Sequence, residues 1–392
     1  MFSHFLSSDT FLACLLPLTL FLLSLRLVGN STLPELRQLL RELLYGVRRT
    51  TSGHFSVERA TLSYEQYANL SNRELDSMRS SYARLGRAHK RIGYELGYPR
   101  KLDRLQDAIR TNAKVTQGIV ELARHDFPDH LRDLDCSGTR GDLGRVRESL
   151  KHFVRDWSEE GREERGRIFS PILDMLKEVP QAKRDSLRVL VPGSGLGRLA
   201  WEISLLGFNV TANELSYFMN LAFRFLLSEK TTQSTNQHTL QPYASWFSHQ
   251  RTDDALFRHI AFPDVVPRLT STLHLAEGDF LAQGPPASFD YIVTLFFLDT
   301  SLNAIETVEH VHSLLKSGGT WINLGPLLWT AGGQATVELS LEEVLHLVRL
   351  TGFRFRGDEC GVASRTVQCE YTADKQAMMQ WLYHAEFWVA DK

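Results

Sequence analysis

The pattern of apolar and polar positions changes character near Arg184. Before it, apolar residues recur at helical spacing, without the alternation of a strand. The segments with this spacing are Pro34–Val47, Tyr64–Glu95, Leu102–Ala123, Leu143–Arg165 and Ile168–Val179. A stretch rich in Asp and Gly at Asp126–Gly141 predicts a loop. The pattern therefore predicts a helical N-terminal domain over residues 33–180.

After Arg184, short apolar runs alternate with helical patterns. Short runs of this kind are typical of strands that are buried on both faces of a parallel sheet. The strand candidates are Leu187–Val191, Phe208–Ala212, Leu273–Ala276, Tyr291–Phe297, Thr320–Leu324 and a closing Phe387–Ala390. The helix candidates are Arg198–Leu206, Ala304–Leu315 and Leu341–Leu350. This alternation predicts an α/β, doubly wound sheet in residues 181–392.

Residues 228–270 separate the second and third strand candidates by far more than a usual connection. The insertion is rich in aromatic residues, namely Tyr243, Trp246, Phe247, Phe257 and Phe262. Two interpretations are open at this point. The insertion forms a lid or a wall of a substrate site, or it packs on the helical domain.

The N-terminal segment 1–32 contains an apolar run, Phe11–Val28, that approaches the ~20 residues of a membrane span. Arg26 and Pro17 interrupt the run, and no Lys or Arg precedes it as in a signal peptide. Membrane contact is expected only if this run is retained in the mature protein. The four scattered cysteines form no CxxC pair, so we expect no metal site and a reducing compartment, cytoplasmic or also nuclear.

Lys and Arg number 44 against 46 Asp and Glu, which leaves no basic excess. Nucleic acid is therefore not expected as a partner. The helical domain is a candidate interface for a homodimer.

A glycine-rich turn carries the main chemical signal. Gly193, Gly195 and Gly197 lie between the first strand candidate and the following helix, where missing Cβ atoms let the backbone approach a ligand. Glu214, at the tip of the second strand candidate, is suited to accept hydrogen bonds from ribose hydroxyls. Asp279 and Phe280 follow the third strand candidate and suit an adenine pocket. The GxGxG spacing favours S-adenosylmethionine over NAD as the cofactor.

Several blocks resemble the carnosine N-methyltransferase family. They are Phe153–Ser158 (FVRDWS), Leu190–Glu202 (LVPGSGLGRLAWE), Phe262–Asp264 (FPD), Gly278–Phe280 (GDF), Phe296–Thr300 (FFLDT) and Trp321–Leu328 (WINLGPLL). The resemblance implies a class I Rossmann-like methyltransferase sheet. It also implies methyl transfer from S-adenosylmethionine to an imidazole nitrogen of carnosine (β-alanyl-histidine), giving anserine, or of related histidine-containing dipeptides.

The resemblance also implies roles for individual residues. The cofactor contacts it implies are His152, Arg155, Gly193, Gly195, Glu214, Asp279, Phe280 and Tyr291. The substrate contacts it implies are Asp299, Trp381 and Tyr383 around the imidazole, with Thr330 at the position of a further contact. Our hypothesis is that Asp299 is the catalytic residue and accepts the imidazole N–H. Structural alternatives stay open at three of these positions. Arg155 can form a surface salt bridge, Tyr291 can be a core aromatic, and Asp299 can cap the next helix.

Three positions depart from the family pattern. The family has Gln at the position of His152, Tyr at that of Trp381, and a substrate-contacting His at that of Thr330. Threonine donates one hydrogen bond but cannot replace an imidazole partner. Other substrates therefore stay open, a protein histidine or another small metabolite, as does a catalytically silent cofactor-binding scaffold.

Overall fold

The computed structural model describes residues 52–132, 141–329 and 334–392. Residues 52–392 form one compact unit, so the expected boundary at residue 180 does not separate two compact domains. Within the described ranges, no helix is long and apolar enough to cross a membrane. The apolar run 11–28 lies outside these ranges.

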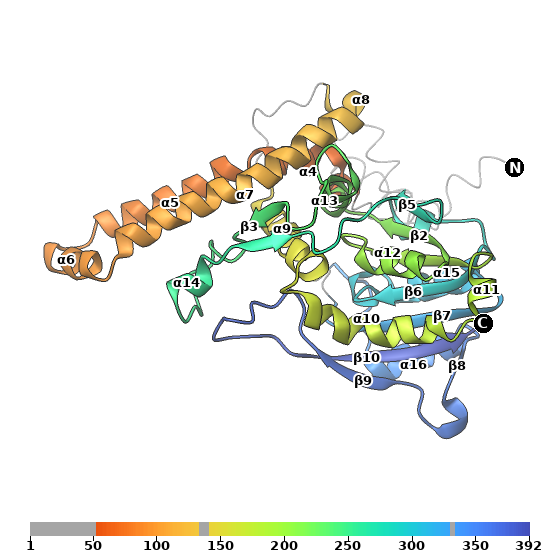
Figure 1. The fold of residues 1–392 in the computed structure, drawn as a ribbon. Coiled ribbons are helices and arrows are strands. Elements are labelled where there is room, and N and C mark those ends of the chain that lie inside the picture. The colour runs from red at the N-terminus through yellow and green to blue at the C-terminus, as the bar shows by residue number, and fades with distance from the viewer. Residues whose placement is uncertain (1–51, 133–140, 330–333) are drawn as a thin grey trace, which may run out of the picture. The chain divides into compact units, whose positions relative to one another are not determined.

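An eight-stranded sheet forms the centre of the described unit (Figure 1). Its parallel part has the order β5 (Leu273–Glu277), β2 (Asn209–Glu214), β1 (Arg188–Pro192), β6 (Phe289–Leu295) and β7 (Leu315–Gly325). Strand β10 (Tyr383–Asp391) lies antiparallel beside β7, and β8 (Arg354–Phe355) and β9 (Arg365–Cys369) pair with β10. This parallel sheet with a reversed final strand confirms the predicted Rossmann-like methyltransferase fold.

Alternate residues of the central strands enter two different hydrophobic cores. In β1, Val189 and Val191 pack with α10 (Arg162–Lys177) and α12 (Arg198–Leu205). Leu190 faces the opposite core, which contains α15 (Ala304–Leu314) and α16 (Leu341–Leu350). Because side chains alternate along a strand, covering both faces demands the continuous apolar runs seen in the sequence.

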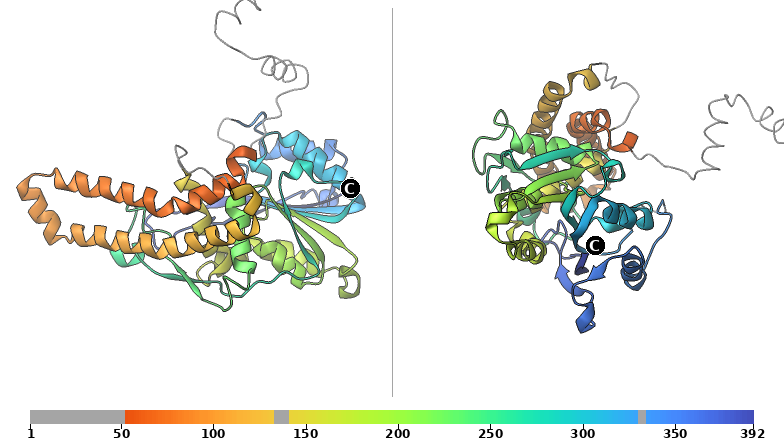
Figure 2. Two further views of the ribbon diagram at one scale, coloured as in Figure 1. Left: turned by 90° about the horizontal axis from the view of Figure 1, so that it is seen from above. Right: turned by 90° about the vertical axis from the view of Figure 1, so that its right-hand side faces the viewer.

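Helices of the N-terminal half pack against each other and against the sheet. They are α3 (Ser52–Phe55), α4 (Val57–Glu65), α5 (Tyr67–Ala83), α6 (Arg87–Glu95), α7 (Tyr98–Asp126), α8 (Pro128–Leu131), α9 (Leu143–Trp157) and α11 (Gln181–Arg184). Helices α5 and α7 form a long hairpin that α6 closes at its tip (Figures 1 and 2). Helices α9 and α10 contact each other, and α10 also contacts β7 and β9.

The single helix expected over Leu143–Arg165 is two helices. Helix α9 ends at Trp157, where the Ser158 hydroxyl donates to the Val154 carbonyl at 2.6 Å. A Cβ at Gly161 would lie 2.2 Å from the Arg155 carbonyl oxygen, so only glycine allows α10 to start so close to the end of α9. The sharp break between α9 and α10 depends on these two contacts.

The insertion packs on the helices. It contains a two-stranded sheet of β3 (His238–Leu240) and β4 (Ile260–Phe262), and the short helix α14 (Asp253–Leu256), after α13 (Tyr217–Leu227). The Gln241 backbone exchanges two hydrogen bonds with the Asn112 amide of α7, at 2.8 and 3.1 Å. The Phe262 ring lies 4.7 Å from the Phe153 ring of α9. These contacts agree with the second interpretation of the insertion.

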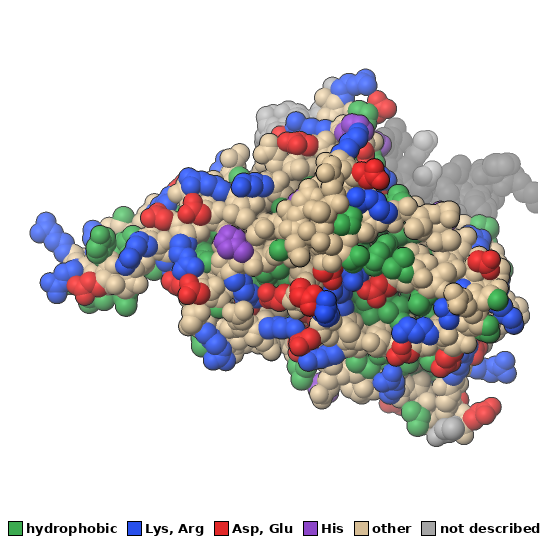
Figure 3. Space-filling model, viewed as in Figure 1, with side chains coloured by type: hydrophobic (Ala, Val, Ile, Leu, Met, Phe, Trp, Pro, Cys, Tyr) green, Lys and Arg blue, Asp and Glu red, His purple; other side chains and the backbone are tan. Residues whose placement is uncertain are grey.

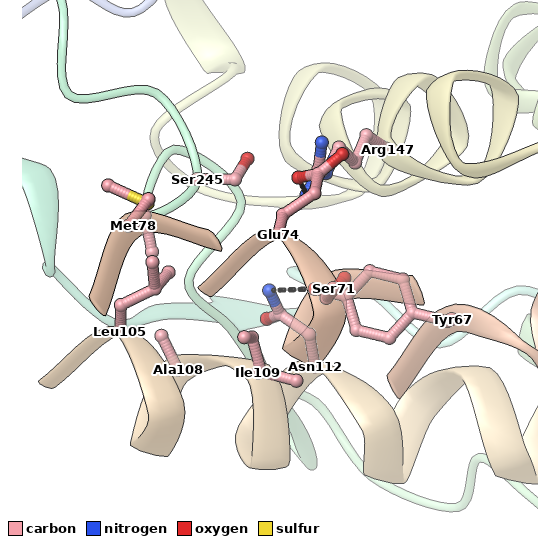
Figure 4. Close-up of a pocket in the computed structure, with 11 residues that line it drawn as sticks. Tyr67, Ser71, Glu74, Met78, Leu105, Ala108, Ile109, Asn112, Arg147 and Ser245 are labelled. Carbon is pink, nitrogen blue, oxygen red and sulfur yellow. Dashed lines mark hydrogen bonds and ion pairs between the residues drawn. The ribbon is translucent and has the colours of Figure 1, made fainter. Parts of the chain in front are cut away.

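A small polar cavity lies between α5, α7, α9 and the insertion (Figure 4). The Asn112 amide donates to the Tyr67 hydroxyl at 3.0 Å, and Arg147 pairs with Glu74 at 2.6 Å. The cavity has a volume of about 20 Å³, which is room for one water molecule. It is too small for a substrate.

Gly197 provides a test of the packing between the glycine turn and α13. Its φ is +70°, and a Cβ there would lie 2.2 Å from the Phe223 ring. We expect Gly197→Ala to lower the free energy of unfolding by about 2–4 kcal/mol, through backbone strain and overpacking. Gly166→Ala on α10 is the matched control, because nothing lies within 4 Å of its added Cβ. For this control, denaturant unfolding should show an unchanged free energy of unfolding or an increase of up to about 1 kcal/mol. Equal losses in both variants would contradict the packing account.

Candidate functional site

The carboxyl ends of the parallel strands meet at one edge of the sheet. Pro192 of β1 lies opposite Asn213 of β2, and Glu214 lies opposite Glu277 of β5. The glycine turn, Glu214 and Asp279 therefore follow neighbouring strand ends. Open α/β sheets bind ligands at this edge.

The three glycines of the turn have positive φ angles of 63°, 57° and 70°. A Cβ on Gly193 would lie 2.6 Å from the Phe297 ring, so this residue permits close packing. Gly195 differs, because within 4 Å its added Cβ would meet only the Arg155 Nη2 atom, at 3.9 Å. Open space beside a guanidinium group is a suitable place for an anionic part of a ligand.

Glu214 is fixed by backbone amides. Its Oε2 accepts from the Gly195 N–H at 2.9 Å, and its Oε1 accepts from the Ser216 N–H at 2.8 Å. Burial raises the pKa of Glu214, while the amides of Ser216, Gly195 and Leu215 act in the opposite direction. Each carboxylate oxygen keeps a second lone pair, so the group can still accept hydrogen bonds from hydroxyls.

Arg155 forms a buried pair with its neighbour Asp156. Arg155 Nε donates to Asp156 Oδ1 at 2.7 Å and Nη2 to Oδ2 at 3.0 Å, while the residues are only 8% and 2% exposed. Burial alone would lower the pKa of Arg155, but the Asp156 carboxylate raises it above its ordinary value. Arg155 is thus a permanent cation, and its salt bridge is buried, so the surface alternative is wrong.

Further hydrogen bonds connect the end of α9 to the glycine turn and to the insertion. The Trp157 indole donates to the Leu196 carbonyl at 2.9 Å. Arg198 Nη1 donates to the Asp156 carbonyl at 3.1 Å and to Asp264 Oδ1 at 2.7 Å. The Asp264 amide in turn donates to the Trp157 carbonyl at 2.8 Å. Three separate sequence blocks are thereby joined in one hydrogen-bonded assembly.

Tyr371 joins the site although no sequence motif pointed to it. Its ring stacks on Phe296 at 4.6 Å, lies 4.6 Å from the Arg155 guanidinium and meets the His152 ring at 5.6 Å. Burial raises its pKa to about 12. The buried Glu164 of α10 holds this segment by accepting the Thr372 N–H at 2.7 Å. Tyr371 lies in an irregular segment between β9 and β10, where periodicity gives no signal.

Asp279 and Phe280 lie at the same edge but differ in exposure. Asp279 is exposed and caps η1 (Phe280–Ala282) by accepting the Leu281 N–H at 2.9 Å. The Phe280 ring is buried, with Phe297 and His310 edge-on at 5.3 and 4.9 Å. Asp279 can therefore still accept from an adenine amino group, while Phe280 forms part of the wall.

The structure does not bring Tyr291 to this edge. It is the third residue of β6, pairs with Val189 and Thr320, and packs edge-on against Phe208 at 6.1 Å. It lies toward the amino ends of the strands, and its placement matches the core-aromatic interpretation. Phe296 follows the carboxyl end of β6 instead, since β6 ends at Leu295.

Asp299 lies after β6 in η2 (Leu298–Thr300) and is 3% exposed. Its Oδ2 accepts the Leu328 N–H at 2.9 Å, which joins the segments after β6 and β7. The alternative that Asp299 caps the next helix is wrong, because Asn303 caps α15 through the Ile305 and Glu306 amides. Burial raises the pKa of Asp299, and the Leu328 amide partly offsets this rise.

The remaining substrate candidates, Tyr383, Trp381 and Thr330, differ in their exposure and in whether the structure describes them. The Tyr383 ring meets Phe296 at 5.7 Å, and its pKa is raised by burial and then by the Asp299 carboxylate. Trp381 is 71% exposed, and Thr330 lies outside the described residues. Of the four substrate candidates, Asp299 and Tyr383 are therefore the described ones that are not largely exposed, and Phe296 contacts Tyr383.

Comparison with known proteins gives one consistent result. The sequence profile of the family described as "Carnosine N-methyltransferase" matches residues 133–392. The carnosine N-methyltransferase of Mus musculus is 34% identical over 310 residues, which cover 75% of this chain and 76% of that protein. That of Schizosaccharomyces pombe is 32% identical over 353 residues, covering 83% and 92%.

A solved S-adenosylmethionine-dependent methyltransferase from Aquifex aeolicus aligns with a TM-score of 0.36 and 13% identity, covering 64% of this chain and 99% of that one. Because this TM-score is low, the fold is assigned from the strand order of the sheet and not from this alignment.

The Glu214 carboxylate is expected to hold the cofactor. Glu214→Gln replaces one accepting oxygen by an NH₂ group, which cannot accept from a backbone amide. We expect calorimetry to show about 10- to 100-fold weaker binding of S-adenosylhomocysteine, by analogy with the loss of a charged hydrogen-bond acceptor. Glu309→Gln, an exposed position on α15, is the control and should bind within twofold of wild type. If Glu214→Gln binds S-adenosylhomocysteine with unchanged affinity, Glu214 does not contact the cofactor.

The raised pKa of Asp299 predicts a pH-dependent effect on stability. The folded state holds the Asp299 proton more tightly than the unfolded chain, so the ionised carboxyl costs stability as pH rises. Asp299→Asn is therefore expected to unfold about 1–3 °C above wild type at pH 8, with the difference shrinking toward pH 4. The exposed Asp185→Asn serves as control and should show no such trend in thermal scans. A difference that grows toward pH 4 would contradict the raised pKa.

Proposed function

Because the chain belongs to the carnosine N-methyltransferase family, we propose that it methylates an imidazole nitrogen of carnosine, giving anserine, or of related histidine-containing dipeptides. The enzyme is an S-adenosylmethionine-dependent methyltransferase. The observation that best supports the proposed substrate is Asp299, a buried carboxylate placed after β6 at the ligand-binding edge.

The residues at this edge fit the cofactor. When bound, S-adenosylmethionine supplies a methyl group that its positively charged sulfur activates for transfer. Arg155 would hold the methionine carboxylate, Glu214 the ribose hydroxyls and Asp279 the adenine amino group. The open space at Gly195, beside the Arg155 guanidinium, supports this fit.

Asp299 orients the imidazole. A neutral imidazole has one N–H and one lone-pair nitrogen. The Asp299 carboxylate accepts the N–H, so the other nitrogen points at the methyl group. It also stabilises the positive charge that grows on the ring during attack. Orientation of this kind contributes on the order of 7–11 kcal/mol.

A strong base is not required. An unperturbed imidazole has a pKa of about 6.5, so most of the substrate is neutral near pH 7. The ring nitrogen forms the new N–C bond as the C–S bond breaks. The methylimidazolium product then releases its N–H proton to solvent.

Thr330 stands where the family has a substrate-contacting His. Two other classes of methyl acceptor are therefore alternatives to carnosine. One is a protein histidine, and the other is another small metabolite. Charged groups of both signs are interspersed on the face seen in Figure 3, which agrees with a small-molecule substrate rather than nucleic acid.

A substrate screen separates these classes. Labelled S-adenosylmethionine is incubated with the full chain and carnosine, histidine, peptides or cell extract. Label on the carnosine imidazole supports the proposal, whereas label only on protein or on another small molecule of the extract supports one of the alternatives.

We also propose a homodimer through the helical hairpin. Its tip exposes apolar side chains to an unusual degree, with Leu85 at 42%, Ile92 at 52%, Tyr94 at 73% and Leu96 at 79%. A cluster of exposed apolar side chains often marks a protein–protein interaction site, whereas single exposed apolar residues do not.

Asp299→Asn tests the catalytic role. Asparagine keeps an acceptor oxygen for the Leu328 amide but removes the negative charge that stabilises the growing imidazolium. We expect kcat for carnosine to fall about 100- to 1,000-fold, as for the loss of an electrostatic stabiliser, with cofactor affinity retained. Turnover near the wild-type rate at saturating carnosine would show that Asp299 does not have this role.

A further inference from the structure

Glu148 lies on α9, one helical turn before His152 and two turns before Asp156. Residues four apart share one face of a helix, so these three groups form a row. His152 Nε2 lies 3.7 Å from Glu148 Oε1, and His152 Nδ1 lies 3.7 Å from Asp156 Oδ2. Both distances exceed a hydrogen bond. The His152 side chain is only 6% exposed, and its buried Nδ1 has no hydrogen-bond partner among the described residues.

The two carboxylates of this row are used differently. Asp156 is engaged by the Arg155 guanidinium through two hydrogen bonds. Glu148 has a half-exposed side chain, and its nearest cation in the described ranges is Lys151, at 3.8 Å. Lys151 also lies 5.8 Å from the Trp246 ring of the insertion. The Glu148 carboxylate therefore keeps free acceptor capacity.

A chain of contacts connects Glu148 to the proposed substrate side of the site. The His152 ring beside it meets Tyr371, Tyr371 stacks on Phe296, and Phe296 meets Tyr383. The pKa values of Tyr371 and Tyr383 are raised mainly by burial, and the Glu148 charge adds to both. Asp299 adds to the Tyr383 value as well. The Tyr383 phenol thus lies in the field of two carboxylates, one from η2 and one from α9.

We propose that Glu148 binds the ammonium group of the substrate while Asp299 holds its imidazole. The inference rests on the proposed function and narrows it to imidazole dipeptides that carry a free, cationic amine. A carboxylate beside aromatic rings is a favourable environment for an ammonium group, through a charge-assisted hydrogen bond and cation–π attraction. The same negative charge repels the dipeptide carboxylate, so it also sets the direction of binding.

The proposal disfavours acceptors without that amine. A histidine inside a protein chain, or a dipeptide with an acylated amine, offers Glu148 no cation. Such an acceptor would leave the carboxylate beside neutral peptide groups. Glu148 therefore determines which methyl acceptor binds, whereas Asp299 orients the imidazole for methyl transfer.

The test compares carnosine with N-acetylcarnosine, which differs only by an acetyl group that removes the ammonium charge. Steady-state kcat and KM are measured for wild type, for Glu148→Gln and for the exposed control Glu121→Gln on α7. In wild type and in the control we expect carnosine to be preferred about five- to tenfold in kcat/KM. In Glu148→Gln the preference should fall to nearly one, through a higher KM for carnosine and little change in kcat.

Salt provides a second measurement that needs no variant. Raising the ionic strength from about 0.05 to 0.5 M should weaken the wild-type preference, because it screens a half-exposed charge pair. A preference that Glu148→Gln and salt both leave unchanged overturns the inference while carnosine methylation itself stands. If wild type does not methylate carnosine at all, the proposed function fails and the inference fails with it.

Discussion

The buried ion pair between Arg155 and Asp156 is the constraint on which the site depends. A buried charge without its partner is strongly destabilising, so the two residues must stay together and stay ionised. Their position is fixed by backbone contacts at both ends, since Arg165 Nη1 donates to the Arg155 carbonyl and Arg198 Nη1 to the Asp156 carbonyl. The end of α9 is therefore held against the glycine turn, and the helical half of the unit would supply Arg155 to the proposed cofactor site.

Two aspartates of the same site illustrate how the environment sets their roles. Burial acts to raise the pKa of both. For Asp156, the Arg155 and His152 contacts outweigh burial and hold the pKa well below its usual range. For Asp299, only the backbone amides of Leu328 and of Asp299 itself oppose burial, and the pKa stays raised. The first is a permanent anion that positions a cation, whereas the second gains most from a cationic partner, such as an imidazolium.

The sequence predicted the parts of the fold that local patterns determine. The run Leu187–Val191 gave β1 within one residue, because a strand buried on both faces must be continuously apolar. Glu214 was placed correctly at the end of the second strand. The break between α9 and α10 was missed, because it depends on the capping by Ser158 and on the contact of Gly161 with α9. Such tertiary contacts leave no periodic signal.

The candidate site was predictable where motifs follow strand ends, and on α9 only through the family resemblance that named His152 and Arg155. Tyr371 lies in an irregular segment and reaches the site through the backbone contacts of Thr372 with Glu164, so sequence spacing gave no indication of it. The cofactor role of Tyr291 was implied by the family resemblance alone, although Tyr291 lies at the amino end of the predicted strand and toward the amino end of β6. The contact between the insertion and the segment before β10, in which the Met378 amide donates to the His249 carbonyl at 2.6 Å, is likewise a tertiary contact without a sequence signal.

A crystal structure of the full chain with S-adenosylhomocysteine tests the central claim most directly. The account predicts the amino-acid carboxylate beside the Arg155 guanidinium, over Gly195, and the ribose hydroxyls within hydrogen-bond distance of Glu214. A ligand bound away from the carboxyl edge of the sheet, or one whose carboxylate avoids an ordered Arg155, would contradict it.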